Sequence, residues 1–240
     1  MKKCNGSIAS IESLGLVDGP GIRTIVFLNG CKLRCIFCHN PEMFNMQEFN
    51  YTPEELVAKI IRNKPYFKRN SGGVTFSGGE PLLQVDFLIE VCKLLKLEDI
   101  HICLDTAGVG IGKYEELLSY VDLVIFDIKA TDENLYNYIT GYHIDESLKF
   151  LNTCQKLGKK MWIRQVIVPG VNDNEEYVDK LYDFIKPLKN IEKIEFLPYH
   201  TMAVDKYKNL GINYKLDGVL DMDADECKKL ENLLKFKLEK

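Results

Sequence analysis

Three cysteines stand within eight positions in the stretch GCKLRCIFCHNPE, residues 30–42. Cys31, Cys35 and Cys38 form the pattern C-x3-C-x2-C, and no fourth cysteine lies nearby. Thiols at such short spacing are typical of a metal site, because an ion or an iron–sulfur cluster needs several sulfur ligands close together. The spacing raises the question of which site uses three cysteines and leaves one position open.

Four kinds of site compete for this pattern. Structural zinc prefers four ligands in two separated pairs, and Cys4 has the wrong spacing to complete such a set. Residues 35–39 match the C-x-x-C-H pattern of haem attachment, but that chemistry belongs to exported proteins and the N-terminus has no apolar signal segment. An electron-transfer cluster normally has four cysteine ligands. A four-iron cluster on three cysteines would leave one iron open for a substrate or cofactor.

The composition predicts one α/β domain over residues 1–240, with a core barrel at about 18–200 and a C-terminal segment and helix at 201–240. A net charge of −4 gives no reason to expect nucleic acid or a membrane surface as partner. Without an export signal or an apolar run of about 20 residues, we expect a cytoplasmic protein with reduced cysteines. We also expect it to be a monomer. The remaining cysteines are expected to pack in the core or to be idle: Cys4, Cys92, Cys103, Cys154 and Cys227.

Short β-rich runs alternate with helical patterns along the whole chain. Strands are expected at 22–28, 72–76, 100–106, 122–129, 160–169 and 191–200. Helices are expected at 51–63, 84–96, 113–120, 132–139, 145–157, 174–188 and 223–238. Thr52, Pro53 and Glu55 form a capping box with proline at the first helical position. Six strands with helical crossovers predict a parallel sheet in a partial (β/α)6 barrel, open on one side because eight units would close it.

Such a sheet carries its chemistry at the carboxyl ends of the strands. The segments at these ends are the cysteine loop, SGGEP, DTAG, DIKATD, VPGVND and PYHTM. Asp127 and Lys129 alternate along one strand, so their side chains point to the same face. Arg164 lies among apolar residues, and a buried arginine needs an anionic partner, so we expect a carboxylate beside it.

The cysteine spacing, with Phe37 just before Cys38, resembles the signature of radical S-adenosylmethionine (SAM) enzymes. In that superfamily the open iron of a 4Fe-4S cluster chelates SAM, and one electron cleaves SAM to a 5′-deoxyadenosyl radical. The stretches SIESLGLVDGPGIRTIVFLNGC, LPYHTMAVDKY and YKLDG resemble the activating enzymes of glycyl radical enzymes. No cysteine-rich insert follows the first motif, which favours the branch with a single cluster.

The resemblance implies an activase that takes the α-hydrogen from a glycine of a partner protein, with pyruvate formate-lyase (formate C-acetyltransferase) as the expected partner. It also implies flavodoxin or ferredoxin as electron donor. Three alternatives stay open: an activase of another glycyl radical enzyme, a radical SAM enzyme acting on a small molecule, and an iron–sulfur electron carrier without catalysis.

The resemblance further assigns roles to single residues. The cluster ligands are Cys31, Cys35 and Cys38, and the cofactor-binding residues are Phe37, Cys38, His39, Asn40, Gly78, Gly79, Glu80, Asp127, Ile128, Lys129, Arg164 and His200. The expected catalytic residues are Asp18, Lys129 and Arg164, with Asp18 at the entry of the target peptide and Arg23 positioning its loop. Asp105 and Thr106 are expected to bind a monovalent cation. Simpler interpretations of the same residues are a turn at Asp18, a helix cap at Asp105 and a structural Asp127–Lys129 salt bridge.

Overall fold

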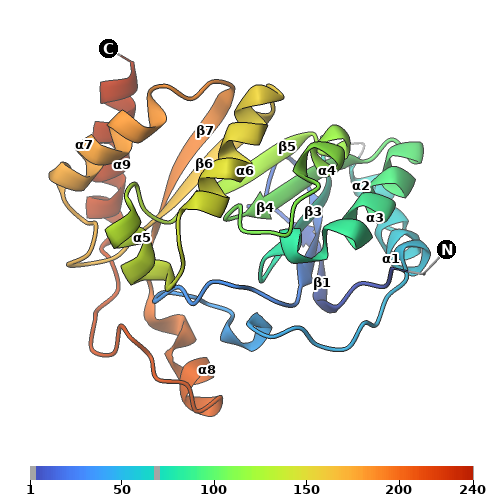
Figure 1. Ribbon diagram of the computed structural model, residues 1–240, viewed down its shortest axis with the longest axis horizontal. Coiled ribbons are helices and arrows are strands. Elements are labelled where there is room, and N and C mark those ends of the chain that lie inside the picture. The colour runs from blue at the N-terminus through green and yellow to red at the C-terminus, as the bar shows by residue number, and fades with distance from the viewer. Residues whose placement is uncertain (1–3, 68–70, 240) are drawn as a thin grey trace.

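A computed structural model of the protein describes residues 4–67 and 71–239, which contain one seven-stranded sheet in the order β1-β2-β3-β4-β5-β6-β7 (Figure 1). The strands are β1 (Ile8–Gly15), β2 (Arg23–Leu28), β3 (Gly73–Gly78), β4 (His101–Thr106), β5 (Leu123–Ile128), β6 (Lys160–Ile167) and β7 (Ile191–Pro198). Strands β2 to β7 are all parallel, whereas β1 pairs antiparallel with β2. The predicted open, partial barrel of six parallel strands is confirmed.

Most helices lie in the connections between the parallel strands and cover the outer face of the sheet, and the last two follow β7 (Figure 1). They are α1 (Pro53–Ile61), α2 (Lys64–Phe67), α3 (Val85–Leu97), α4 (Tyr114–Tyr120), α5 (Glu133–Thr140), α6 (Asp145–Lys156), α7 (Glu175–Ile185), α8 (Val204–Asn209) and α9 (Ala224–Leu238). Three 3-10 turns are η1 (Pro41–Met43), η2 (Pro81–Gln84) and η3 (Thr201–Ala203). Within the described ranges, none of these helices has the length and apolarity needed to cross a membrane.

The start of α1 follows the sequence prediction. The Thr52 side chain accepts from the Glu55 amide, and the Glu55 carboxylate accepts from the Thr52 amide at 2.8 Å, so the capping box is complete. Each predicted helix appears with ends shifted by at most a few residues. The short helices α2 and α8 were not predicted, because runs of four and six residues carry too little periodicity to be recognised.

Strand β1 corrects the prediction of six strands. Its pairing with β2 shifts register between Ile8 and Ser10 and again between Glu12 and Gly15. The apolar residues Ile8, Ile11 and Leu14 stand three positions apart in the sequence instead of two, so no period-two pattern marks the strand. Most of β1 is exposed at the sheet edge, so burial does not enforce alternation there.

The core divides between the two faces of the sheet. The outer face packs against the helices through a large apolar cluster that includes Leu56, Leu88 and Leu181. The lower part of the inner face is filled by Cys103, Leu123 and Ile125, with Trp162 beside them. Cys92, Cys154 and Cys227 are also buried, as predicted, and Cys4 packs partly against the main cluster. The inner face near the carboxyl ends of the strands is left for polar groups.

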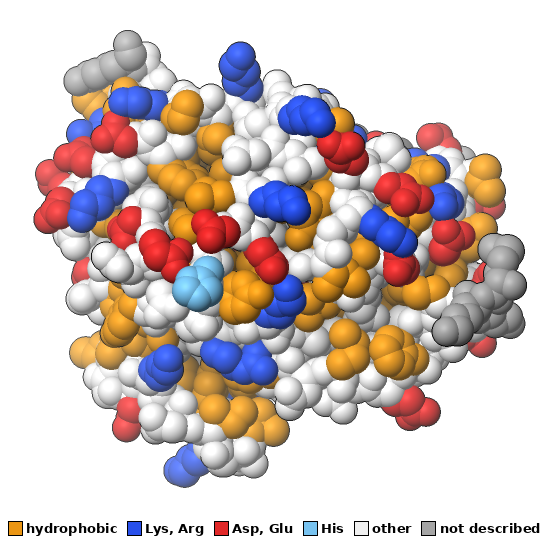
Figure 2. Space-filling view, viewed as in Figure 1, with side chains coloured by type: hydrophobic (Ala, Val, Ile, Leu, Met, Phe, Trp, Pro, Cys, Tyr) orange, Lys and Arg blue, Asp and Glu red, His pale blue; other side chains and the backbone are white. Residues whose placement is uncertain are grey.

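The surface in Figure 2 shows acidic and basic side chains mixed over the helices, with hydrophobic side chains visible between them. This mixture agrees with the small net charge of −4. On the side opposite most of the helices, the loop between β2 and α1 runs across the strand ends, and α8 lies below it (Figure 1). That loop carries the three clustered cysteines.

Candidate active site

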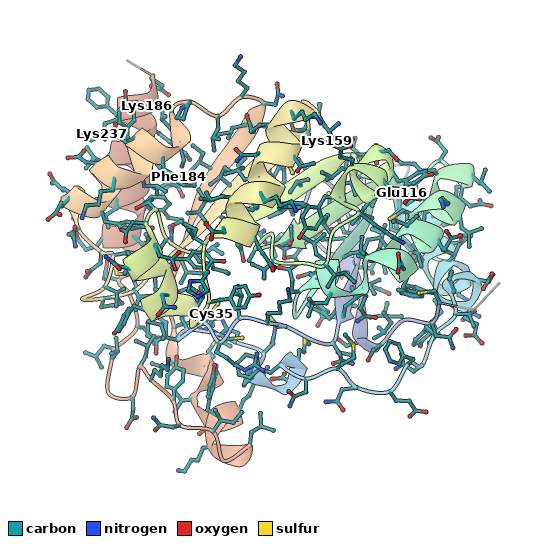
Figure 3. All side chains as sticks on the ribbon, viewed as in Figure 1. Cys35, Glu116, Lys159, Phe184, Lys186 and Lys237 are labelled. Atoms are coloured by element: carbon teal, nitrogen blue, oxygen red, sulfur yellow. The ribbon has the colours of Figure 1, made fainter. Side chains whose placement is uncertain are left out.

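The carboxyl ends of the strands and the cysteine loop enclose a cavity of about 240 Å³. Figure 3 shows Cys35 on this loop, where it passes the ends of the central strands. The cavity brings together residues from six strands or the loops that follow them. Its lining is Cys31, Leu33, Cys35, Phe37, Cys38, His39, Asn40, Phe44, Ser77, Gly78, Gly79, Glu80, Asp105, Thr106, Ala107, Asp127, Lys129, Arg164, Val166 and Leu197.

The three predicted ligands lie on the wall of this one cavity. Cys35 is buried, and Cys31 and Cys38 are partly buried. Burial raises the pKa of all three thiols, that of Cys35 to about 12, so each carries a proton until a metal displaces it. In the described part of the chain, no three His, Cys, Asp or Glu side chains are placed to hold a single metal ion. Three thiols spread around a cavity fit a larger iron–sulfur cluster better than one zinc ion.

Backbone hydrogen bonds fix the cysteine loop on both sides. The Cys31 amide donates to the Phe44 carbonyl oxygen at 3.0 Å, which closes the loop on itself. The Arg34 amide donates to the Thr140 carbonyl oxygen at 2.7 Å, and the Ile36 amide to that of Ile139 at 2.9 Å. The C-terminal end of α5 therefore supports the segment between the first and last cysteine.

The Gly78-Gly79-Glu80 segment lies directly against this loop. The Glu80 amide donates to the Gly30 carbonyl oxygen at 2.7 Å. Gly78 has a φ of +116°, and a Cβ atom on Gly79 would lie 2.3 Å from that Gly30 oxygen. Only glycine therefore allows the end of β3 to approach the cysteine loop this closely.

Glu80 orders the segment from below. Its carboxylate accepts from the amides of Leu82 at 3.1 Å and Ala107 at 3.0 Å, and from the hydroxyl of Thr106. Burial raises the pKa of Glu80 to about 7 in spite of these hydrogen bonds. Glu80 ties the end of β3 to the end of β4.

The charged groups alternate on the inner face as predicted. Lys129 Nζ donates to Asp127 Oδ2 at 2.7 Å and lies 5.5 Å from the centre of the Phe37 ring. Burial opposes a charge on Lys129, but Asp127 outweighs it and raises the pKa of the ammonium. Ile128 points the other way: its side chain belongs to the outer core cluster and does not line the cavity, so only its backbone is available to a cofactor.

The two residues predicted to bind a monovalent cation have different partners. Asp105 faces inward and accepts from Ser77 Oγ at 2.7 Å; burial, and next to it Asp127, raises the pKa of Asp105 to about 6. The Thr106 hydroxyl donates to Glu80 and accepts from the Gly108 amide at 2.9 Å. Both residues line the cavity. Their binding of a monovalent cation stays a prediction.

Arg164 has the carboxylate partners that its burial predicted. Its Nε donates to Glu195 Oε2 at 3.2 Å, and its Nη1 lies 3.6 Å from Asp18 Oδ1. Nη2 donates to the Val17 carbonyl oxygen at 2.6 Å, which attaches the loop between β1 and β2 to β6. Arg23 holds the same loop from the other side, since its Nη1 donates to the Pro20 carbonyl oxygen at 2.9 Å. Asp18 does not line the cavity and reaches it through Arg164.

His39 and His200 form a stacked pair at the rim. Their ring centroids lie 3.9 Å apart with an interplanar angle of 27°, and His39 Nε2 is 3.0 Å from His200 Nδ1. Lys206 of α8 donates to the His39 carbonyl oxygen at 2.9 Å and to Asn40 Oδ1 at 3.1 Å. The C-terminal segment therefore contacts the residues that follow Cys38.

Several lining residues were not predicted. The sequence could have identified Ser77 as a cavity residue. It stands two residues after Thr75, on the same face of β3, at the strand's carboxyl end. Phe44, Val166 and Leu197 carried no such signal, since apolar residues at such positions pack in most cores.

Comparison with known proteins agrees with this geometry. Residues 25–185 match the model of the radical SAM superfamily. The chain is 52% identical to the pyruvate formate-lyase-activating enzyme of Clostridium pasteurianum, over 98% of this chain and 99% of that protein. It is 42% identical to the enzyme of the same name from Staphylococcus epidermidis, over 96% of both chains. A solved domain of pyruvate-formate lyase-activating enzyme from Bacteroides vulgatus superposes with a TM-score of 0.57 at 25% identity, over 69% of this chain and 94% of that one. The chain therefore belongs to the radical SAM superfamily and, within it, to the family of pyruvate formate-lyase-activating enzymes.

Proposed function

We propose that this protein is an iron–sulfur activase that cleaves SAM reductively and abstracts the α-hydrogen of a glycine in pyruvate formate-lyase (formate C-acetyltransferase). The observation that carries the proposal is the single cavity lined by Cys31, Cys35 and Cys38 together with the Asp127–Lys129 pair. The near full-length similarity to pyruvate formate-lyase-activating enzymes supports this choice of partner.

The residues of the cavity fit the cofactors of the superfamily. The three cysteines would hold a 4Fe-4S cluster, and the backbone of Gly78 and Gly79 would face the amino group of SAM. When bound, the cluster supplies one electron to SAM, which releases methionine and the carbon radical that takes the glycine hydrogen. Lys129 and Asp127, which form a 2.7 Å salt bridge with each other, offer opposite charges to the zwitterionic methionyl end.

The remaining cofactor contacts lie around that centre. The cysteine loop supplies Phe37, His39 and Asn40, the end of β3 supplies Glu80, and the middle of β6 supplies Arg164. Ile128 would contribute its backbone alone, because its side chain belongs to the outer core cluster. The stacked His39–His200 pair presents flat rings at the rim, which suits contact with the adenine of SAM.

The entry of the target peptide is assigned to the loop around Asp18. Leu16 and Val17, next to Asp18 in sequence, are 72% and 70% exposed. Exposed apolar side chains beside a charged residue that contacts Arg164 favour a surface that another polypeptide covers. Asp18, with Arg164 and Lys129, is therefore proposed to position the peptide and cofactor for hydrogen transfer.

Finer assignments belong to the same proposal. A cluster that must accept one electron at low potential calls for flavodoxin or ferredoxin as donor. Asp105 and Thr106 supply hard oxygen atoms that suit a monovalent cation next to SAM. We propose that the protein acts as a monomer in the cytoplasm, where thiols stay reduced.

The proposal is tested with anaerobically reconstituted protein, a chemical reductant, SAM and purified pyruvate formate-lyase. We expect methionine and 5′-deoxyadenosine as products and a glycyl radical signal in electron paramagnetic resonance. Failure to cleave SAM would leave only an electron carrier. Cleavage without a radical on pyruvate formate-lyase would point to another glycyl radical enzyme or to a small molecule, which other partners added in parallel would reveal.

Variants separate the two halves of the reaction. Asp127→Ala, Lys129→Ala and His200→Ala should weaken SAM binding while the iron content stays the same. Asp18→Ala should keep SAM affinity and lose most of the glycyl radical yield, because its carboxylate contacts Arg164 at the edge of the barrel and does not line the cofactor cavity. A wild-type radical yield from Asp18→Ala would rule out a role in peptide entry.

A further inference from the structure

The loop between β1 and β2, which carries Asp18, is not held by its own backbone. In the part of the chain that the structure describes, no backbone–backbone hydrogen bond involves residues 16–21. Gly19 and Gly21 both have a positive φ, of 126° and 68°. A glycine-containing segment without internal hydrogen bonds has many accessible conformations, so other parts of the protein must fix the position of Asp18.

Side chains from three strands supply the hydrogen bonds that fix this loop. Arg164 of β6 and Arg23 of β2 donate to loop carbonyl oxygens on either side of Asp18. The carbonyl oxygen of Asp18 itself accepts from Thr75 Oγ1 of β3 at 2.5 Å. Thr75 is completely buried and does not line the cavity. Among these three anchors, Thr75 is the one bonded to the backbone of Asp18.

The direction of the hydrogen bonds at Thr75 follows from their chemistry. Arg23 Nε donates to Thr75 Oγ1 at 2.6 Å. Because a guanidinium has no acceptor, the hydroxyl accepts from Arg23, and its single proton is left for the Asp18 carbonyl oxygen. The positive charge of Arg23 polarises the hydroxyl and strengthens it as a donor. A hydrogen-bonded chain therefore runs from Arg23 through Thr75 to Asp18.

The packing at Gly19 shows how closely the loop lies on this chain of hydrogen bonds. A Cβ atom on Gly19 would lie 2.8 Å from Arg23 Cδ and 3.0 Å from Cys103 Sγ. The residue after Asp18 thus rests directly on buried side chains of the barrel. The hydrogen bonds of Thr75 lead toward the site through Asp18, whose carboxylate lies 3.6 Å from Arg164 Nη1.

We propose that Thr75 is a positioning residue for the protein substrate: its hydroxyl fixes the Asp18 carbonyl oxygen and thereby sets the affinity of this loop for the partner polypeptide. The inference rests on the proposed function, in which the loop around Asp18 receives the target peptide. A loop that is already ordered loses less conformational entropy when a partner binds, so removal of the anchor weakens binding. The cofactor cavity keeps its lining, so SAM should bind as before.

The test replaces Thr75 with valine, which has the same shape without the hydroxyl. Initial rates of glycyl radical formation are measured by electron paramagnetic resonance on anaerobically reconstituted protein, at several concentrations of pyruvate formate-lyase. We expect Thr75→Val to raise the KM for pyruvate formate-lyase about tenfold, which corresponds to the loss of one hydrogen bond. SAM affinity and SAM cleavage without the partner should be unchanged. Thr75→Ser keeps the hydroxyl and should stay within about twofold of the wild-type KM.

The matched control is Thr24→Val. Thr24 is also completely buried, and its Oγ1 accepts from Asn63 Nδ2 at 2.9 Å. It stands next to Arg23 in β2 and so faces the opposite side of the sheet. Thr24→Val removes a buried hydroxyl without touching the loop, and it should keep the wild-type KM. If Thr75→Val does not fold, Thr75→Ala, which leaves room for water, takes its place in the same measurements.

A double variant shows whether Thr75 acts through Asp18. In the Asp18→Ala background, the effect of Thr75→Val on the KM should fall from about tenfold to less than about threefold, because both changes remove the same interaction. A purely structural role of Thr75 would give the full effect in both backgrounds.

A wild-type KM in Thr75→Val, a Thr75→Ser variant as impaired as Thr75→Val, or the full effect in the Asp18→Ala background would each overturn the inference. All three results are read against a wild-type protein that is active, so they leave the proposed function intact. Failure of the proposed function has a different signature, since the wild-type protein itself would then form no radical on pyruvate formate-lyase.

Discussion

Replacing Arg164 with glutamine should show how firmly the barrel holds the loop that carries Asp18. The guanidinium of Arg164 donates to the Val17 carbonyl oxygen at 2.6 Å and to Glu195 at 3.2 Å, and it lies 3.6 Å from the Asp18 carboxylate. The Arg164 side chain is only 9% exposed, so water competes little for these contacts. Glutamine is shorter and neutral and cannot reproduce them.

The expected loss in the free energy of unfolding follows from the two hydrogen bonds of Arg164 and from the exposure of its partners. A hydrogen bond to a charged group contributes about 1.5–3 kcal/mol when it is well buried. Glu195 and Asp18 keep 28% and 25% exposure, and Glu195 retains Lys193 at 2.8 Å, so solvent and that lysine offset part of the loss. We therefore expect Arg164→Gln to lower the free energy of unfolding by about 2–3 kcal/mol. For a chain of this size the melting temperature should fall by about 4–12 °C.

The assay is urea denaturation of metal-free protein at fixed pH and salt, followed by circular dichroism. The matched control is Lys193→Gln, which removes the other cation beside Glu195; its side chain is 42% exposed. That control should cost less than about 0.5 kcal/mol. If Arg164→Gln were no less stable than Lys193→Gln, the three contacts of Arg164 would not contribute to the free energy of unfolding, which contradicts the prediction.

Three other predictions concern the cysteine loop and its support. Cys35→Ala should abolish iron binding and SAM cleavage, whereas Cys154→Ala, buried in α6, should keep both; iron analysis and product assays decide. Gly79→Ala should cost about 3 kcal/mol in urea unfolding because its Cβ would lie 2.3 Å from a backbone oxygen, against about 1 kcal/mol for Gly170→Ala, which has a φ of +73° and open space. Burial raises the pKa of Glu80 from 4.5 to about 7. The folded state then keeps a proton that the unfolded state has lost, so the free energy of unfolding should fall by about 3 kcal/mol as pH rises through that window, and Glu80→Gln should remove this fall in metal-free protein.

Local rules were enough for the parts of the structure in which neighbours in sequence decide the outcome. Thr52 and Glu55 cap α1 because both groups lie within one helical turn. Asp127 and Lys129 face the same cavity because a strand alternates with a period of two. The sequence predicted that a carboxylate lies beside Arg164, since an unpaired buried guanidinium is too costly. The identity of that carboxylate was not predictable, because Asp18 and Glu195 come from distant parts of the chain.

Longer-range features left no comparable signal. The stacking of His39 on His200 joins residues 161 positions apart, and each histidine alone has many ordinary explanations. Strand β1 escaped recognition because its apolar residues stand three positions apart and lack the alternation that marks a strand.

The charged side chains inside the barrel bear on how the site could bind a cofactor. Asp18, Asp105 and Asp127 lie near one another through Arg164, and the pKa of Asp105 is raised to about 6, first by burial and next by Asp127. Arg164 and Lys129 face these carboxylates, Arg23 also acts on Asp18, and Glu195 is shared with Lys193. Burial beside another carboxylate disfavours the charged form of Asp105, and a cationic ligand would relieve that cost. SAM carries a sulfonium, an ammonium and one carboxylate, a net charge of one positive. A site that holds buried carboxylates next to glycine-rich backbone and three thiols is thus suited to a cationic cofactor. We infer that part of the binding free energy of SAM comes from relieving this repulsion.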